Sequence, residues 1–212
     1  MLFSWDEFDR FRKVPVNVKE VAPELENEIG KPYVDVKDPY GCCSSYAEHF
    51  EKEFEASLSR FGVKVDFRRQ SENYRSGKYA KYIIQAVQKR REIFDILDKF
   101  RQQVATPEER EAYYPVSIYC PVCGKDETTI TSSSEDGVTC EYGHKGTWDF
   151  SKDFNCKLAW KIDWPMRWMI EGVDFEPGGK DHASPGGSYD TSKIIAKKIF
   201  GAQAPMFKGY EF

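Results

Sequence analysis

Apolar side chains recur at helical spacing in the first half of the chain. Ser45 and Glu48 form the pattern of a capping box, and Gly62 offers a left-handed stop after the apolar run. The pattern therefore predicts a helix over 45–61. Its apolar positions are Tyr46, Phe50, Phe54, Leu58 and Phe61.

Two further segments follow before the character of the sequence changes. Residues 63–67 alternate apolar and polar side chains, which predicts a short strand. A second helical stripe then predicts one long helix over about 78–100. Its apolar positions are Tyr79, Tyr82, Ile83, Ala86, Val87, Ile93, Phe94, Leu97 and Phe100.

Beyond Pro107 the predicted elements become short and prone to β structure. Residues 115–119 and 147–150 are two such pieces, and turns that contain glycine, serine and cysteine separate them. This stretch is typical of a small inserted module with a core of its own.

The last third of the chain alternates strand and helix patterns. Apolar residues at every second position from Leu158 to Trp164 predict a strand, and Pro165 is well placed to open a helix that Gly172 ends. A strand at 173–176, glycine-rich turns and an apolar helical stretch near its end complete the sequence. Strand–helix alternation at both ends predicts an α/β fold in which helices cover a parallel sheet.

Composition narrows the class of protein. The 212 residues carry 31 Lys plus Arg against 35 Asp plus Glu, a formal charge of −4, which argues against a protein that coats nucleic acid through a global basic field. With 40% hydrophobic and 15% aromatic residues, the chain is expected to be globular, with one or two domains. It has no apolar run of the roughly 18 residues that a membrane span needs, and its start lacks the pattern of a signal peptide, so we expect a cytoplasmic protein without a membrane contact.

Four residues have the spacing of a zinc knuckle pair. The pattern is C-x2-C-x16-C-x3-H, formed by Cys120, Cys123, Cys140 and His144. Each pair has a glycine where its turn has to bend, Gly124 in the first and Gly143 in the second. The alternative is four unrelated residues. Because four protein ligands leave no open position, the metal is expected to fold the module rather than to do chemistry.

Other polar groups allow two interpretations. Cys42, Cys43 and His49 either contribute to a second metal site or are two buried thiols beside a surface or capping histidine. The basic residues of 68–75, continued by lysines and arginines along the following helix, either form a solvated face or touch RNA phosphate. The glycine-rich turn 178–182 lies just past a predicted strand, where an open parallel sheet binds ligands, although an ordinary polar turn has the same composition. Trp160 and Trp164 lie on one face of a predicted strand, and ordinary core packing produces the same pattern.

Several segments together resemble the class I lysyl-tRNA synthetases. The most specific is 157–168, Lys-Leu-Ala-Trp-Lys-Ile-Asp-Trp-Pro-Met-Arg-Trp, followed by similar motifs at 172–177, 179–182 and 186–190. Residues 3–15, Gly41 with 45–49, and 67–74 are also similar to that family, so the resemblance covers essentially the whole chain.

The resemblance implies a fold and a reaction. The fold would be the Rossmann-like parallel sheet of a class I aminoacyl-tRNA synthetase, interrupted by a small zinc-binding insertion. Residues 1–105 would be its first part, 106–155 the insertion and 156–212 part of the second half. The reaction would join lysine to ATP, with magnesium, to give lysyl-adenylate, and would then transfer the lysyl group to tRNA(Lys).

The resemblance also implies site residues. Trp160, His182 and Tyr210 match positions that line the lysine pocket, and Asp181 would hold the loop or the adenosine end. The phosphate-handling signatures, of the His-Ile-Gly-His and Lys-Met-Ser-Lys-Ser types, belong upstream of Met1 and downstream of Phe212, so no catalytic residue is assigned and this chain alone is expected not to form lysyl-adenylate. The alternative is a stand-alone zinc-containing RNA- or protein-binding module derived from the synthetase, without catalysis.

Overall fold

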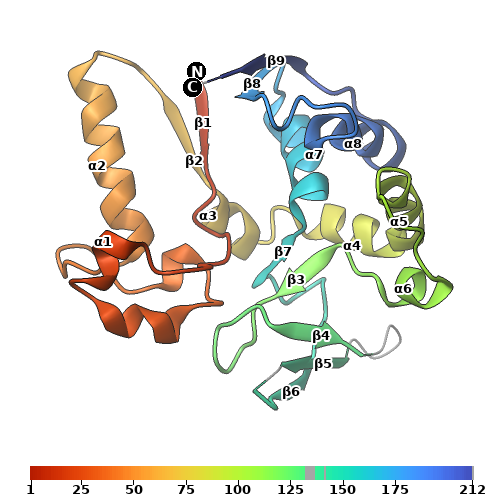
Figure 1. The fold of residues 1–212 in the computed structure, drawn as a ribbon, viewed down its shortest axis with the longest axis horizontal. Coiled ribbons are helices and arrows are strands. Elements are labelled where there is room, and N and C mark those ends of the chain that lie inside the picture. The colour runs from red at the N-terminus through yellow and green to blue at the C-terminus, as the bar shows by residue number, and fades with distance from the viewer. Residues whose placement is uncertain (132–136, 141, 212) are drawn as a thin grey trace. The chain divides into compact units, whose positions relative to one another are not determined.

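The computed structural model describes residues 1–131, 137–140 and 142–211, apart from the side chains of 137 and 140. This part of the chain divides into two compact units, residues 1–78 with 117–157 and residues 79–116 with 158–212 (Figure 1). Within the described ranges, every helix is too short or too polar to cross a membrane. Each unit has its own buried core.

The first unit begins with a parallel strand pair. Strand β1 (Leu2–Trp5) runs beside β2 (Asp66–Arg69), with Leu2 opposite Asp66 and Trp5 opposite Arg69. Helix α2 (Tyr46–Arg60) packs on this pair, because its Phe54 ring lies 5.1 Å from Phe3 and 5.3 Å from Trp5 between ring centroids. The short helix α3 (Gln70–Arg75) follows β2 directly.

Helix α2 confirms the first predicted helix. The hydroxyl of Ser45 accepts the N–H of Glu48 at 3.1 Å, and Gly62 has the left-handed φ of 68°. The reciprocal arm of the capping box differs from the prediction, because the Glu48 carboxylate accepts the N–H of Ser44 instead of Ser45. The predicted strand at 63–67 is displaced and begins only at Asp66.

A second cluster of buried side chains lies under the segment between β1 and α2. This segment holds helix α1 (Val16–Lys19) and short 3₁₀ turns at Pro23–Glu28 and Tyr33–Asp35. Its buried members are Phe11, Val18, Ala22, Leu25 and Val36.

The inserted segment of the first unit is mostly β structure. Strands β3 (Val116–Ile118) and β7 (Cys156–Leu158) pair with each other, and β4 (Thr128–Ile130), β5 (Gly137–Cys140) and β6 (Lys145–Thr147) form an antiparallel sheet. The strand predicted over 147–150 overlaps β6 at one residue only. Trp148 and Phe150 are buried beyond its end, so their apolar character reflects packing rather than a strand.

The second unit starts with three helices, α4 (Ala80–Gln88), α5 (Arg90–Asp98) and α6 (Pro107–Ala112). The single long helix predicted over 78–100 is therefore wrong. Lys89 has ψ of 17°, which interrupts the helical hydrogen bonds between two stretches that each bury an apolar face. Lys89 is neither glycine nor proline, so the sequence carries no signal for this break.

The rest of the second unit combines helices with a parallel strand pair. Helix α7 (Trp160–Glu171) is followed by β8 (Phe175–Gly179), and α8 (Ser188–Ile195) continues into a π-helical turn at Ala196–Phe200. Strand β9 (Met206–Tyr210) runs parallel to β8. The described strands thus give α/β content with parallel pairs in small sheets.

Three predictions for this region are wrong. Residues from Trp160 onward are helical rather than a strand, and Pro165 lies inside α7 instead of opening it. The glycines at 178 and 179 belong to β8, so the turn begins only after them. Gly172 does end the helix, with a left-handed φ of 63°.

Candidate functional site

Three tryptophans form a continuous stripe along α7. The rings of Trp160 and Trp164 are stacked with centroids 4.9 Å apart, and those of Trp164 and Trp168 are 4.7 Å apart. Spacing of four residues places them on one helix face. Trp168 also donates its Nε1–H to the Glu176 carboxylate at 2.8 Å, which ties the stripe to β8.

The proline inside α7 is compensated by α8. A proline has no N–H, so Pro165 leaves the carbonyl of Lys161 without its usual helical partner. The hydroxyl of Ser192, a fully buried side chain of α8, donates to that carbonyl at 3.1 Å. This hydrogen bond explains how the helix tolerates an interior proline.

A buried ion pair lies next to the Trp160 ring. The guanidinium of Arg167 is 3.1 Å from the carboxylate of Asp163, and their side chains are 7% and 0% exposed. The guanidinium carbon also lies 5.2 Å from the centre of the Trp160 ring. The pair therefore holds Trp160 in place with a cation whose charge is already neutralised.

The loop after β8 brings a histidine to the tryptophans. The His182 ring centroid is 6.2 Å from that of Trp160 and 5.7 Å from that of Trp164. The loop is fixed on both sides, because the N–H of His182 donates to Gly179 at 3.0 Å and its carbonyl accepts from Tyr189 at 3.2 Å. We refer to Trp160, Trp164 and His182 as the tryptophan site.

The two other predicted pocket residues adjoin this loop in different ways. Asp181 is 79% exposed on its side chain, and its carboxylate lies 3.8 Å from Nε2 of His182. Tyr210 stands opposite Gly179 in the β8–β9 register, and its carbonyl accepts the N–H of Lys180 at 3.0 Å. The structure thus places Trp160 and His182 ring to ring, Asp181 beside them, and Tyr210 on the same loop through its backbone.

Glycines let the backbone approach closely around the loop. A Cβ at Gly178 would lie 2.6 Å from the Phe207 ring, and one at Gly187 would lie 2.7 Å from the carbonyl oxygen of Ser184. A Cβ at Gly179 would lie 2.5 Å from the carboxylate of Asp181 and 4.0 Å from Cδ2 of His182. Aromatic rings with an exposed carboxylate nearby form a site that attracts an organic cation.

The predicted zinc residues are partly assembled in the first unit. The ligand atoms of Cys120, Cys123 and His144 lie within 4.8 Å of one another, and Cys120 Sγ is 3.5 Å from Nδ1 of His144. Gly124 and Gly143 have left-handed φ values of 75° and 84°, as the predicted turns require. The side chain of Cys140, the fourth predicted ligand, lies outside the described residues. We call Cys120, Cys123 and His144 the knuckle.

Backbone amides lower the pKa of one knuckle thiol. Burial acts to raise the pKa of Cys120, but hydrogen bonds from the backbone of Cys123 and Val122, with smaller contributions from Cys123 Sγ and His144, lower it to about 7. The thiolate is the form that binds metal.

A second group of ligand-type side chains lies before α2. The ligand atoms of Asp38, Cys42, Cys43 and His49 fall within 4.8 Å of one another, and His49 Nδ1 is 3.2 Å from Cys42 Sγ and 3.3 Å from Asp38 Oδ1. Cys42 is exposed and Cys43 is half-buried, so the interpretation as two buried thiols is wrong. We call these four residues the Asp38 cluster.

The charge of Asp38 organises this cluster. Its Oδ2 accepts the backbone N–H groups of Cys42 and Cys43, each at 2.7 Å. Burial raises the pKa of Asp38, but the amides of Tyr40, Cys43 and Cys42 outweigh it and lower the pKa overall. Burial, the Cys43 thiol and the Asp38 carboxylate raise the pKa of Cys42.

Comparison with known proteins identifies the family. The family model described as tRNA synthetases class I (K) matches residues 1–212. The chain belongs to this family. Among the curated relatives, lysine–tRNA ligases from Thermococcus kodakarensis, Pyrococcus furiosus and Treponema pallidum are 46%, 45% and 39% identical to it over 213, 213 and 212 residues. These matches cover 99–100% of this chain and 40% of each relative, so the chain spans about 40% of the length of the curated relatives it matches.

In this class I synthetase chain, the start of the basic segment 68–75, at the end of β2, makes internal contacts. Arg69 donates to the carboxylates of Glu51 and Glu55 at 2.9 and 2.7 Å. The backbone N–H groups of Gln70 and Ser71 donate to the buried Glu7 carboxylate at 3.1 and 2.7 Å. Arg69 is therefore held by internal ion pairs, and Gln70 and Ser71 are buried.

Sequence reasoning missed two residues that complete these groups. Trp164 was noted on one face with Trp160 but was not assigned to the pocket, and its ring lies nearer to His182, at 5.7 Å, than that of Trp160, at 6.2 Å. Asp38 completes the Asp38 cluster, and it lies only four residues before Cys42 in a turn that contains proline and glycine.

Proposed function

We propose that this chain is part of the catalytic domain of a lysine–tRNA ligase, which activates lysine with ATP and transfers it to tRNA(Lys). The observation that carries the proposal is the tryptophan site, a histidine packed on two tryptophans, in a chain similar over its whole length to lysine–tRNA ligases. The relatives' name supports the ligase over a stand-alone binding module.

In this proposal Trp160, His182 and Tyr210 line the pocket of the substrate lysine. The aromatic walls suit a methylene stem and attract its ammonium by about 0.5–2 kcal/mol. Asp181 supplies negative charge at the exposed side of the loop. Arg167 does not repel the substrate, since Asp163 neutralises it.

We also propose that the knuckle residues Cys120, Cys123 and His144, with Cys140, hold a structural zinc ion. A thiol with a pKa of about 7 and two glycine turns support this assignment. A bound zinc ion would join these residues and so stabilise a module that is too small for a large core of its own. The Asp38 cluster, which combines thiol, imidazole and carboxylate ligands, is the candidate for a second metal ion.

The remaining expectations follow from the same proposal. The two parallel strand pairs would belong to one Rossmann-like sheet, with residues 1–105 and 156–212 as its incomplete parts and 106–155 as the zinc-binding insertion. ATP and magnesium would be bound by the complete enzyme, which would act in the cytoplasm.

The test is lysine-dependent exchange of pyrophosphate into ATP by the complete gene product. We expect exchange with lysine, and a KM for lysine that rises about 2- to 30-fold in Trp160→Leu, the range that corresponds to one lost cation–π contact. The matched control is Trp5→Phe, which changes a tryptophan of the first unit that bonds to Glu55. Absence of lysine-dependent exchange in the complete protein would reject the ligase and favour the binding module.

Metal content tests the two proposed metal sites. We expect two equivalents of zinc in the purified protein, one lost in Cys120→Ser and the other in Cys43→Ser. If both variants keep the full metal content, neither assignment holds.

A further inference from the structure

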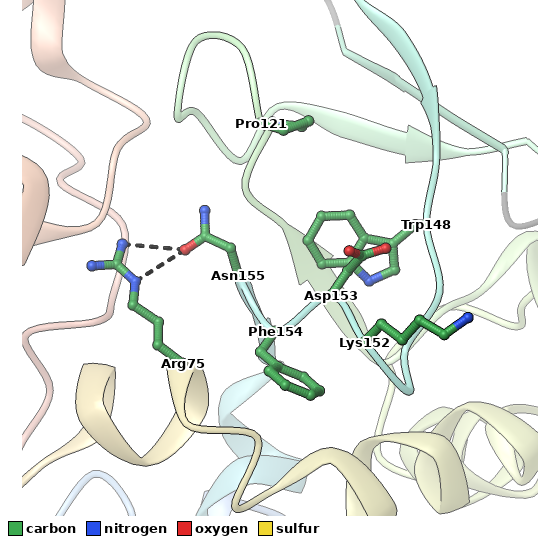
Figure 2. Close-up of a pocket in the computed structure, with 7 residues that line it drawn as sticks. All are labelled: Arg75, Pro121, Trp148, Lys152, Asp153, Phe154 and Asn155. Atoms are coloured by element: carbon green, nitrogen blue, oxygen red, sulfur yellow. Dashed lines mark hydrogen bonds between the residues drawn. The ribbon is translucent and has the colours of Figure 1, made fainter.

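A pocket beside the knuckle is built from charged side chains that already serve the fold. It has a volume of about 510 Å³, and Figure 2 shows its lining. Arg75 donates from Nε and Nη2 to Oδ1 of Asn155, each at 3.2 Å, and also pairs with Asp35. The ammonium of Lys152 lies 3.0 Å from the Asp149 carboxylate. We therefore assign these groups to the stability of the first unit rather than to a ligand.

Phe100 lies at the surface of the second unit, just after α5. It is the last apolar residue of the helical stripe in the sequence, and it is 37% exposed. One side of its ring faces the protein, because a Cβ built at Gly186 would lie 3.1 Å from Cδ1 of Phe100. Gly186 has a left-handed φ of 75°, which favours glycine. The ring therefore lies directly on the backbone at this position.

Gly186 belongs to the loop that carries His182, residues 180–187, which we call the histidine loop. Hydrogen bonds within the loop brace it. The hydroxyl of Ser184 donates to the carbonyl of Asp181 at 2.9 Å, and the N–H of Gly187 donates to the carbonyl of Ser184 at 2.7 Å. A loop braced in this way moves as one body, so a shift at Gly186 is transmitted to the His182 ring.

Different elements hold the two ends of the histidine loop. At its start, the N–H of Lys180 donates to the carbonyl of Tyr210 in β9 at 3.0 Å. Near its end, the N–H of Gly186 donates to the carboxylate of Asp190 in α8 at 3.1 Å. The Phe100 ring covers Gly186 on the side where other residues have a side chain. The position of the loop thus depends on a residue far from it in the sequence.

Ion pairs fix the support from which Phe100 reaches the loop. Arg110 of α6 donates to the carboxylate of Asp95 in α5 at 2.6 and 2.7 Å. Arg101, the residue after Phe100, lies 3.5 Å from the Glu109 carboxylate of α6. These contacts join the end of α5 to α6, so the ring is presented to Gly186 from a defined position.

We propose that Phe100 is a positioning residue for lysine binding. It acts through Gly186 and sets where the histidine loop places His182 against Trp160. The inference rests on the proposed function, since it takes the tryptophan site as the lysine pocket. It gives a role in amino-acid recognition to a residue outside the motifs that form that pocket.

Aminoacylation of tRNA(Lys) by the complete gene product, with ATP and tRNA saturating, tests the proposal. We expect Phe100→Ala to raise the KM for lysine about 2- to 30-fold, the range for substitutions that act at a distance. Phe100→Leu keeps apolar bulk over Gly186 and should raise the KM less. Phe61→Ala is the matched control, because Phe61 is 82% exposed and lies at the end of α2 in the first unit. It should leave the KM unchanged.

A double-mutant cycle separates positioning from general damage. If Phe100 acts through His182, Phe100→Ala should raise the KM for lysine in the wild type and change it little in a His182→Ala background. A merely structural effect would multiply the KM by the same factor in both backgrounds.

Hydrogen exchange measures the contact without any activity. The amides of His182 and Gly187 donate to the carbonyls of Gly179 and Ser184. In Phe100→Ala these amides should lose protection, because the histidine loop is no longer held at Gly186, whereas the amides of α7 should keep theirs. Phe61→Ala should leave both sets unchanged.

Three outcomes would overturn the inference. They are an unchanged KM for lysine in Phe100→Ala, a KM that rises by the same factor in the His182→Ala background, or unchanged protection of the histidine loop. Failure of the ligase proposal gives a different result, because the unmodified complete protein would then charge no tRNA(Lys), while hydrogen exchange would still report the contact between Phe100 and the loop.

Discussion

The knuckle and the tryptophan site hold their side chains in place with different forces. In the knuckle, two thiols and an imidazole gather in a β module, and backbone amides favour the charged form of Cys120. In the tryptophan site, stacked rings, a buried ion pair and a hydroxyl bound to a helix carbonyl do the same work. Under the proposed zinc assignment, the first depends on ligand charge and so on metal and protons, whereas the second depends on packing and is expected to be insensitive to both.

Metal removal should separate the two regions most strongly. Structural zinc contributes on the order of 10 kcal/mol in small domains. A chelator, or the change Cys120→Ser, should therefore abolish hydrogen-exchange protection in β4, β5 and β6 and leave α7 and α8 protected. Cys156→Ala is the control, because burial raises the pKa of Cys156 to about 12 and its thiol is not a ligand candidate. Equal loss of protection in α7 would mean that the regions are not independent.

Breaking the buried ion pair should destabilise the second unit and leave the knuckle unchanged. Arg167→Met removes the guanidinium that pairs with the fully buried Asp163 carboxylate, and breaking a buried ion pair costs about 3–5 kcal/mol. Urea denaturation should show the loss, and the double variant Asp163→Leu with Arg167→Met should recover most of it. Zinc content should stay unchanged in both proteins. A single variant as stable as the wild type would show that the pair does not hold Trp160.

Acid should weaken the knuckle before it affects the tryptophan site. The folded-state pKa of Cys120 is lowered to about 7, so its thiolate persists above that pH and is lost as the pH falls through it. Protons then compete with zinc at Cys120 and at the other ligands, so the zinc affinity should fall at least tenfold for each pH unit below 7, or about 1.4 kcal/mol for each proton bound. Zinc release measured with a chromogenic chelator between pH 8 and 5.5 checks this. A flat profile would exclude Cys120 as a ligand.

The smallest expected effect concerns the proline in α7. Ser192→Ala removes the hydroxyl that donates to the Lys161 carbonyl and should destabilise the second unit by about 1–2 kcal/mol. Ser57→Ala is matched to it, since the exposed Ser57 hydroxyl donates to the Glu53 carbonyl of α2 at 2.9 Å. The control should change stability by less than about 0.5 kcal/mol. Equal effects would show that Pro165 needs no compensation from α8.

The sequence predicted the features that are set by residues close together in the chain, and it did not predict those that depend on residues far apart. The Ser45 cap of α2 and the knuckle turns are set by residues a few positions apart; both follow the prediction, except that Glu48 binds the N–H of Ser44 rather than that of Ser45. The start of α7 was not, because alternation from Leu158 to Trp164 suits a strand and a proline argues against a helix interior. The hydrogen bond that compensates for Pro165 comes from Ser192, which lies 31 residues after Lys161 and so gives no local signal.

The candidate sites show the same limit. Trp160, His182, Asp181 and Tyr210 were found through family resemblance, and the structure groups them around one loop. The pocket beside the knuckle had no sequence signal, because Arg75 and Asn155 are 80 residues apart and neither belongs to a recognisable motif. Its chemistry becomes visible only when the fold brings these groups together.

The glycines around β8 determine how this stretch can vary under selection. In a library randomised at these codons, position 187 should return only glycine, because two fixed carbonyl oxygens occupy the space of a side chain. Position 178 should accept another residue only with a smaller partner at 207, so the two codons should covary. Position 179 should accept alanine, with a displaced Asp181, which makes it the codon where evolution can adjust the loop without rebuilding it.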